Sequence, residues 1–170
     1  NDSKLCKLIR EDLADEFIPY IHTNKISLLS EINPSIYETH PFIKGKKLTL
    51  IEYASFFGSI QIVRFLKFNK VPLNEELWFY SIHSNNGEFI HFLEENQVNL
   101  SDKSIGQIFM LSIRCHHNDL ACYIENNMIT AKNKLKIYSE NLNECILNSH
   151  NYYFYPNNID DLISSNTFCY

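Results

Sequence analysis

One repeated segment constrains the fold of this chain more than any other feature. Leu48–Asn74, LTLIEYASFFGSIQIVRFLKFNKVPLN, reads as helix, tight turn, helix and turn. Apolar residues recur three and four positions apart on both sides of Gly58, which is the period of an α-helix. Helices of about two turns are too short to be stable alone in water. The helix pair is therefore expected to bury its apolar side against a neighbouring pair.

Three other stretches carry the same pattern. Tyr53–Val71 aligns without gaps on Tyr80–Val98 and Leu111–Ile129, and more weakly on Leu8–Ile26. An asparagine follows each second helix, at Asn24, Asn69, Asn96 and Asn127. We expect Asn69 to end its helix by adopting the left-handed conformation that asparagine tolerates. Ser59 and Asn118 are expected to cap the starts of second helices.

This repetition predicts an all-α solenoid of about four to five helix–turn–helix repeats that forms one domain over residues 1–170. The predicted repeats span about 4–28, 48–74, 75–100 and 104–129, with an insertion at 29–47 and a degenerate C-terminal unit at 130–170. Pro34, Pro41 and Gly45 exclude a continuous helix in the insertion. Its apolar content predicts ordered packing on the first two repeats, with a short helix near Pro34–Glu38.

The motif residues carry a resemblance to a known family. Thr49–Ser55, Gly58, Ile62–Leu66 and Leu73–Asn74 stand in the register of the ankyrin repeat, with its T-P-L-H-x-A opening, inter-helix glycine, V-V-x-x-L-L helix and V-N ending. Leu50 and Glu52 replace the family's proline and histidine, and the glycine expected after the second helix is Lys70, Gln97 or Met128. The chain thus resembles a divergent ankyrin-repeat protein over roughly Leu5 to Ile129. Its low glycine content and many Asn, Ile, Tyr and Phe residues are similar to the expanded ankyrin-like families of unknown function in parasitic protists.

The resemblance implies a binding surface on the concave side of the stack. The two positions before each inter-helix turn face that side, and the turn residues lie beside them. The set is Phe56, Phe57, His83, Ser84, Asn85, Arg114, Cys115 and His116. Aromatic, basic and amide side chains of this kind are common at interface hot spots. The alternative left open is that Phe56 and Phe57 pack beneath the insertion.

We therefore expect a non-enzymatic module that binds a protein or peptide partner through its concave face. An extended curved surface suits such a ligand better than a small-molecule substrate. The chain has no P-loop, no G-x-G-x-x-G and no H-E-x-x-H. Neither a cofactor nor a metal is expected. The alternative is a structural repeat segment of a larger protein, without a ligand of its own.

A third hypothesis places an enzyme or a metal site around Cys115–Cys122, a stretch that also holds His116 and His117. The repeat alignment puts a helix–turn–helix between the two cysteines, whereas structural zinc sites usually have closer pairs. A nucleophilic cysteine also needs a base within reach and a group to orient that base. We interpret the cysteines as packing residues and the histidines as exposed turn residues.

Charge and cysteine content limit the possible partners and the cellular compartment. The net charge of −5 and the scattered basic residues argue against a nucleic-acid partner. Five cysteines without framework spacing, and no apolar run long enough to span a bilayer, predict an intracellular, cytoplasmic protein. The chain starts without methionine and ends in the apolar run Thr167–Tyr170, so we expect it to be part of a longer protein.

Overall fold

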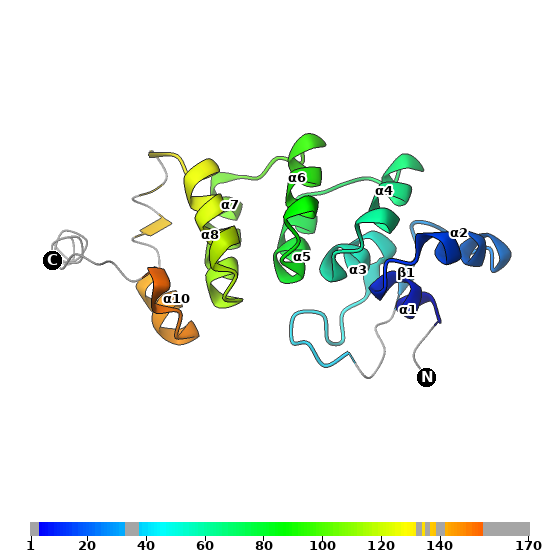
Figure 1. Ribbon diagram of the computed structural model, residues 1–170, viewed down its shortest axis with the longest axis horizontal. Coiled ribbons are helices and arrows are strands. Elements are labelled where there is room, and N and C mark those ends of the chain that lie inside the picture. The colour runs from blue at the N-terminus through cyan, green and yellow to red at the C-terminus, as the bar shows by residue number, and fades with distance from the viewer. Residues whose placement is uncertain (1–3, 33–37, 132–133, 135–136, 139–141, 155–170) are drawn as a thin grey trace, which may run out of the picture. The chain divides into compact units, whose positions relative to one another are not determined.

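The chain folds into short α-helices. The computed structural model describes residues 4–32, 38–131, 134, 137–138 and 142–154 (Figure 1). These residues are mostly helical, which confirms the predicted all-α fold. They divide into two compact units, Asn1–Asn99 and Leu100–Tyr170. The interpretation of 1–170 as a single repeat domain stays a prediction.

The first unit contains three consecutive helix pairs. They are α1 (Lys4–Arg10) with α2 (Ala14–Thr23), α3 (Leu50–Phe57) with α4 (Ile60–Phe68), and α5 (Glu76–Ser84) with α6 (Gly87–Glu95). Helix α3 packs against both α1 and α5, and α2 packs against α4 (Figure 1). First helices thus contact first helices, and each pair lies within one of the predicted repeats.

A two-residue ladder closes the insertion at its base. Strand β1 (Glu31–Ile32) pairs antiparallel with β2 (Leu48–Thr49), and Ile32 stands opposite Leu48. Both of these apolar side chains are buried. The ladder brings the two ends of the insertion together next to the start of α3. The helix predicted near Pro34–Glu38 lies mostly at 33–37, outside the described residues.

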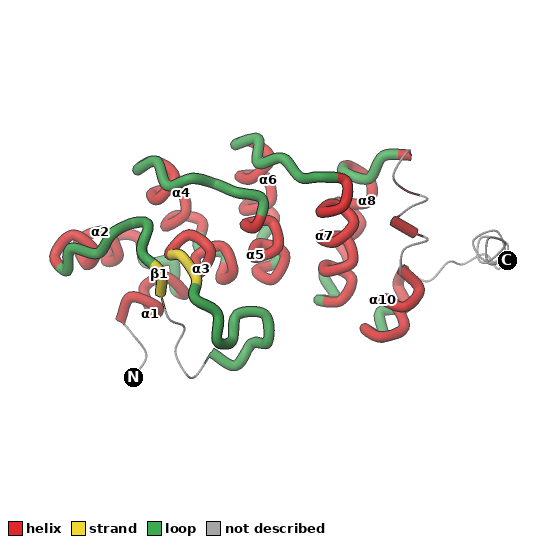
Figure 2. Tube along the Cα trace, turned by 180° about the vertical axis from the view of Figure 1, so that it is seen from behind, coloured by secondary structure: helices red, strands yellow, loops and turns green. Residues whose placement is uncertain are grey.

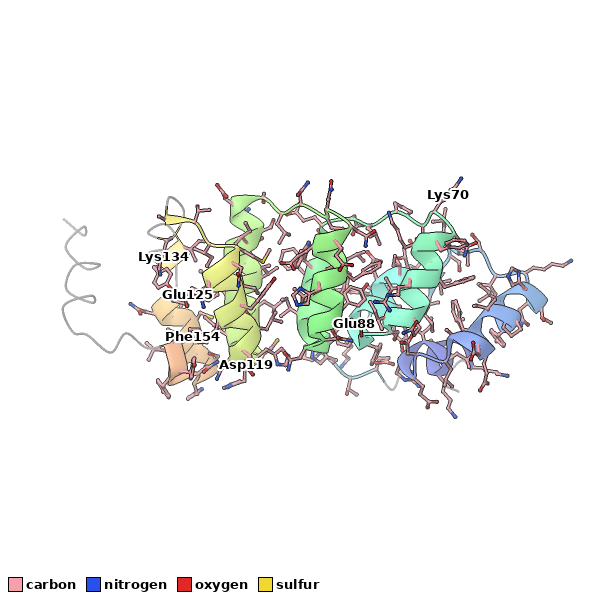
Figure 3. The ribbon with its side chains drawn as sticks, turned by 45° about the horizontal axis from the view of Figure 1, so that its top comes forward. Lys70, Glu88, Asp119, Glu125, Lys134 and Phe154 are labelled. Atoms are coloured by element: carbon pink, nitrogen blue, oxygen red, sulfur yellow. The ribbon has the colours of Figure 1, made fainter. Side chains whose placement is uncertain are left out.

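The second unit is built on α7 (Asp102–Arg114). Helix α8 (Asn118–Asn127) and helix α10 (Leu142–Ser149) both pack against it, and the 3-10 helix η1 (Tyr152–Phe154) follows α10. Glu125 of α8 accepts a hydrogen bond from the Tyr138 hydroxyl and lies 3.4 Å from Lys134 Nζ (Figure 3). The buried Asn151 amide donates to the carbonyl of Ile113 at 2.9 Å, so the end of α10 is tied to the end of α7.

A left-handed residue ends the first helix of every pair and recurs after α10. These residues are Asp12, Gly58, Asn85, His116 and His150, with φ of 49°, 71°, 50°, 58° and 55°. At Gly58, close packing favours glycine in addition to the positive φ. A Cβ there would lie 3.0 Å from Ser84 Cβ, because the turn after α3 touches the end of α5. A side chain at this position would therefore require Ser84 to move by a few tenths of an ångström.

The second helices end differently from our prediction. Asn69 has φ of −84° and is not left-handed. Its side-chain amide donates to the carbonyl four residues earlier, and the same bond forms at 2.8, 2.9, 2.8 and 2.8 Å from Asn24, Asn69, Asn96 and Asn127. The chain reverses one residue later, at Lys25, Lys70 and Gln97 in the first unit, with φ of 52°, 66° and 56°. The asparagine side chain thus satisfies a carbonyl of the last helical turn. The residue after it, which is not glycine, adopts the strained positive φ.

The predicted N-caps were also wrong. Ser59 forms no cap bond to α4 and instead donates to the carbonyl of Ile9 at 2.5 Å. The start of α4 is capped by Asp12, whose carboxylate accepts from Gln61 N and Ile62 N at 3.0 Å each. Asn118 is the first residue of α8, and its side-chain oxygen accepts from Asn151 Nδ2 at 2.7 Å. At α4, a partner distant in sequence thus takes the place of the local cap.

The strain at Lys70 gives a stability prediction. Lys70→Gly is expected to raise the free energy of unfolding by about 0.5–1 kcal/mol, because glycine adopts a positive φ without steric cost. Asn69→Ala is expected to lower it by about 1 kcal/mol through loss of the bond to Phe65 O. Urea unfolding followed by circular dichroism measures both changes.

Lys67→Gly is the matched control, because Lys67 lies in the last turn of α4 with helical backbone. It is expected to destabilise the protein by about 1 kcal/mol. A Lys70→Gly variant that loses as much stability as Lys67→Gly contradicts the proposed strain.

Candidate functional site

The predicted binding residues fall into both units. Phe56 and Phe57 end α3, and His83, Ser84 and Asn85 end α5, so the first unit brings these five together. The Phe56 ring lies 5.0 Å from that of Phe57 and 5.3 Å from that of His83, between ring centroids. Arg114, Cys115 and His116 belong to the second unit, at the end of α7. They are considered separately below.

The insertion covers part of the predicted surface. The Phe42 ring lies 4.2 Å from His83 and 5.4 Å from Tyr80, and it stacks on Phe56 at 6.3 Å. His40 lies 5.0 Å from both Phe56 and His83. Phe56 is consequently only 8% exposed. For Phe56, the structure therefore shows the alternative, in which this ring packs beneath the insertion. Figure 2 shows the backbone of the insertion loop beside α3 and α5.

The aromatic cluster is therefore defined by His40, Phe42, Phe56, Tyr80 and His83. Aromatic pairs at these separations contribute about 0.5–1.5 kcal/mol each beyond the area they bury. Lys46 adds a cation–π contact, with Nζ 4.2 Å from the centre of the Phe42 ring. The cluster holds the loop 38–47 against the ends of α3 and α5. Phe57 is half-buried at its side, against Tyr53 at 4.8 Å.

A polar anchor fixes the same loop at its start. The buried Tyr53 hydroxyl donates to Glu38 Oε1 at 2.6 Å. Arg10 Nη1 donates to Glu38 Oε1 and to the Tyr53 hydroxyl oxygen, both at 3.0 Å. Burial, followed by the bond to Glu38, raises the pKa of Tyr53 well above its usual range. The anchor joins α1, the insertion and α3.

Sequence reasoning missed the anchor and three members of the cluster, which are His40, Phe42 and Tyr80. Glu38, His40 and Phe42 lie in the insertion, outside the repeats, and Arg10 lies in the weakest copy of the repeat. Their partners lie up to 43 residues away in the sequence. The available signal was the apolar content of the insertion, which predicted packing without naming the contacts.

Two cysteines of the second unit, Cys115 and Cys145, have thiols with raised pKa values. Cys115 is half-buried, and burial raises the pKa of its thiol, as it does for Cys145. Cys145 Sγ lies 3.4 Å from the carbonyl oxygen of Met110. Thiols with raised pKa values carry little of the nucleophilic thiolate. Among the described residues, no three His, Cys, Asp or Glu side chains gather as a metal ion would require.

The other predicted residues of the second unit are accessible. Arg114 is exposed, and so is His116, whose Nε2 lies 2.9 Å from the carbonyl oxygen of Ser149. This contact joins the turn after α7 to the end of α10. In the first unit, Asn85 is exposed and Ser84 is partly so.

No protein-family model matches the chain, and neither does a curated protein or a solved structure. Within the described ranges, no helix has the length and apolar character needed to cross a bilayer. The function is therefore argued from the residues of this chain alone.

The anchor gives a pH prediction. The pKa of Tyr53 is raised, and burial raises that of Tyr80 to about 12. Both groups stabilise the fold fully below about pH 10, where tyrosines of the unfolded chain begin to ionise. Stability is therefore expected to fall as the pH rises above about 10, toward the higher pKa values of the folded state. Urea unfolding over a pH series measures this loss.

Tyr53→Phe should flatten the alkaline loss and lower stability at neutral pH by about 1–3 kcal/mol, because Glu38 and Arg10 lose a buried partner. Tyr152→Phe is the control, since Tyr152 is exposed. Equal alkaline slopes in the wild type and the Tyr53→Phe variant contradict the assignment.

The aromatic cluster gives a proteolysis prediction. Phe42→Ala removes the ring that contacts His83, Tyr80 and Phe56, so the loop should detach more often. Cleavage by trypsin after Lys44, Lys46 or Lys47 should accelerate about tenfold, which corresponds to about 1.4 kcal/mol. Leu29→Ala is the control, because Leu29 is 65% exposed. Equal cleavage rates in both variants mean that the cluster does not hold the loop.

Proposed function

We propose that this chain is a divergent ankyrin-like repeat module that binds a protein partner without catalysis. The helix ends support the repeat assignment. In the first unit, each pair reverses at a left-handed residue between its helices and again after an asparagine-capped second helix. The same chain path in successive pairs fits a stack of similar units.

The aromatic cluster carries the binding proposal. It fixes the loop 38–47 on the ends of α3 and α5, where the family resemblance places the concave face. His40 and Pro41 are exposed on this loop, and Asn85 is exposed at the end of α5. Exposed polar groups on a rigid aromatic base cost little entropy to order on binding. Arg114 and His116 are proposed to contribute at the corresponding position of the second unit.

A partner bound to this surface should be sensitive to its exposed residues. Phe56→Ala is unsuitable as a test because Phe56 is buried and its loss destabilises the cluster. Pro41→Ser with Asn85→Gly and Arg114→Ala changes exposed side chains outside the aromatic cluster, and glycine accepts the positive φ of residue 85. We expect this triple variant to lose a partner captured from the native cell, with an affinity reduction of about tenfold or more. Affinity capture with quantitative mass spectrometry measures the loss.

The control is Glu95→Ala with Asp119→Ala, two exposed residues outside the predicted set. Urea unfolding should show the same stability for both variants as for the wild type. A partner that the triple variant retains contradicts the proposed surface. The absence of any reproducible partner favours the alternative, a structural segment without its own ligand.

A further inference from the structure

The outer side of α4 carries an unexplained aromatic residue. Phe68, in its last turn, is 86% exposed, the highest value among the exposed large apolar residues. In the repeat alignment its position is held by Thr23, Glu95 and Asn126. Helix packing in the other pairs therefore needs no apolar group there. Phe68 adds nothing that the fold requires.

Basic residues surround Phe68. Arg64 and Lys67 are exposed on α4, and the exposed Lys70 lies two residues after the end of this helix. In Figure 3, Lys70 points away from the helices. No aspartate or glutamate occurs between Tyr53 and Asn74, although the whole chain has a net charge of −5. A basic residue in the last turn complements the helix dipole, which accounts for Lys67 but not for Phe68.

The neighbouring helices of the first unit expose carboxylates in their first turns. Helix α2, which packs against α4, exposes Asp15 and Glu16 in its first turn. Helix α6 exposes Glu88 and Glu95. Arg64 Nη2 lies 2.8 Å from Glu88 Oε1. The positive surface thus has exposed carboxylates on both neighbouring helices, mainly in the first turns of α2 and α6, and Lys25 extends it past the end of α2.

We infer that Arg64, Lys67, Phe68 and Lys70, the α4 patch, bind an acidic peptide segment of another protein. Carboxylates of the segment pair with the three basic side chains, and one of its apolar side chains packs on the Phe68 ring. Burial of the Phe68 ring beneath the bound segment supplies most of the affinity, and the basic side chains select an acidic ligand. This inference concerns a different face from the aromatic cluster and does not rest on the function proposed above.

The carboxylates beside the patch favour a peptide over an anionic membrane. A flat lipid surface would meet Asp15, Glu16, Glu88 and Glu95 together with the patch, and like charges would repel it. A single segment lying along α4 avoids most of this repulsion. The Arg64–Glu88 pair is exposed, with 47% and 55% of the side chains accessible. Such pairs are weak, so a ligand carboxylate replaces Glu88 at little cost.

The test is a selection of binding peptides with the whole chain as bait. A phage library of random peptides is panned against the wild type, and peptides that also bind the Lys67→Glu/Lys70→Glu variant are removed. We expect the remaining sequences to be enriched in Asp and Glu and to contain a large apolar residue. The best of them is synthesised with a fluorescent label, and its Kd is measured by anisotropy.

Two variants test the two parts of the patch. Lys67→Glu/Lys70→Glu is expected to weaken binding at least about tenfold at low salt, with a smaller effect at about 0.5 M salt, where charges are screened. Phe68→Ala is expected to weaken binding about tenfold at both salt concentrations. Lys7→Glu/Lys103→Glu and Leu147→Ala are matched controls on exposed residues of other helices, and they should retain wild-type affinity. Circular dichroism confirms that all variants are folded.

Several results overturn the inference. They are a library that yields no acidic peptide, or peptides whose Kd is unchanged in the patch variants. Equal losses in the control variants do so as well. Binding to phosphatidylserine vesicles that requires Phe68, without peptide binding, assigns the patch to a membrane instead. Dimerisation in sedimentation experiments that is lost in Lys67→Glu/Lys70→Glu assigns it to a second copy of this chain.

Discussion

The first unit depends on the burial of α3 between α1 and α5. Leu50, Tyr53 and Ala54 of this helix are 0% exposed. A fully buried side chain of the size of Leu50 contributes about 1.5–3 kcal/mol, which a helix of two turns cannot obtain alone. Thr49 and Glu52 form a reciprocal capping box at its start, and Gly58 allows close contact with α5 at its end. Helix α3 therefore holds both of its neighbours in place.

Polar side chains in the turns also link successive helix pairs by hydrogen bonds. Asp12, in the turn after α1, caps the start of α4. Asn86 caps α6 with its side-chain oxygen, and its Nδ2 donates to the carbonyl of Gly58 at 3.2 Å. A helix end in one pair is thus satisfied only when the next pair is folded. Such coupling makes folding cooperative between nearest neighbours, as in repeat proteins.

The insertion changes what the first unit presents to a ligand. A stack without it would expose the aromatic ends of α3 and α5, whereas here Phe42 and His40 cover Phe56. The cover is held by contacts of two kinds, a ring cluster and the buried anchor of Arg10, Glu38 and Tyr53. The accessible groups are consequently those of the loop. The exposed Phe68 and its basic neighbours lie on a different helix. They form a positively charged surface on a chain whose net charge is −5.

The sequence alone determined the helix pairs and their order, because apolar residues at helical spacing and a recurring asparagine are local signals. It also limited the arrangement of Phe56 to two alternatives. Only the tertiary structure decided between them, and only it placed Asp12 rather than Ser59 on α4 and Glu38 beside Tyr53. Those bonds join residues up to 50 positions apart, and no local pattern encodes them. A side chain's partner depends on which surfaces the folded helices bring within hydrogen-bonding distance.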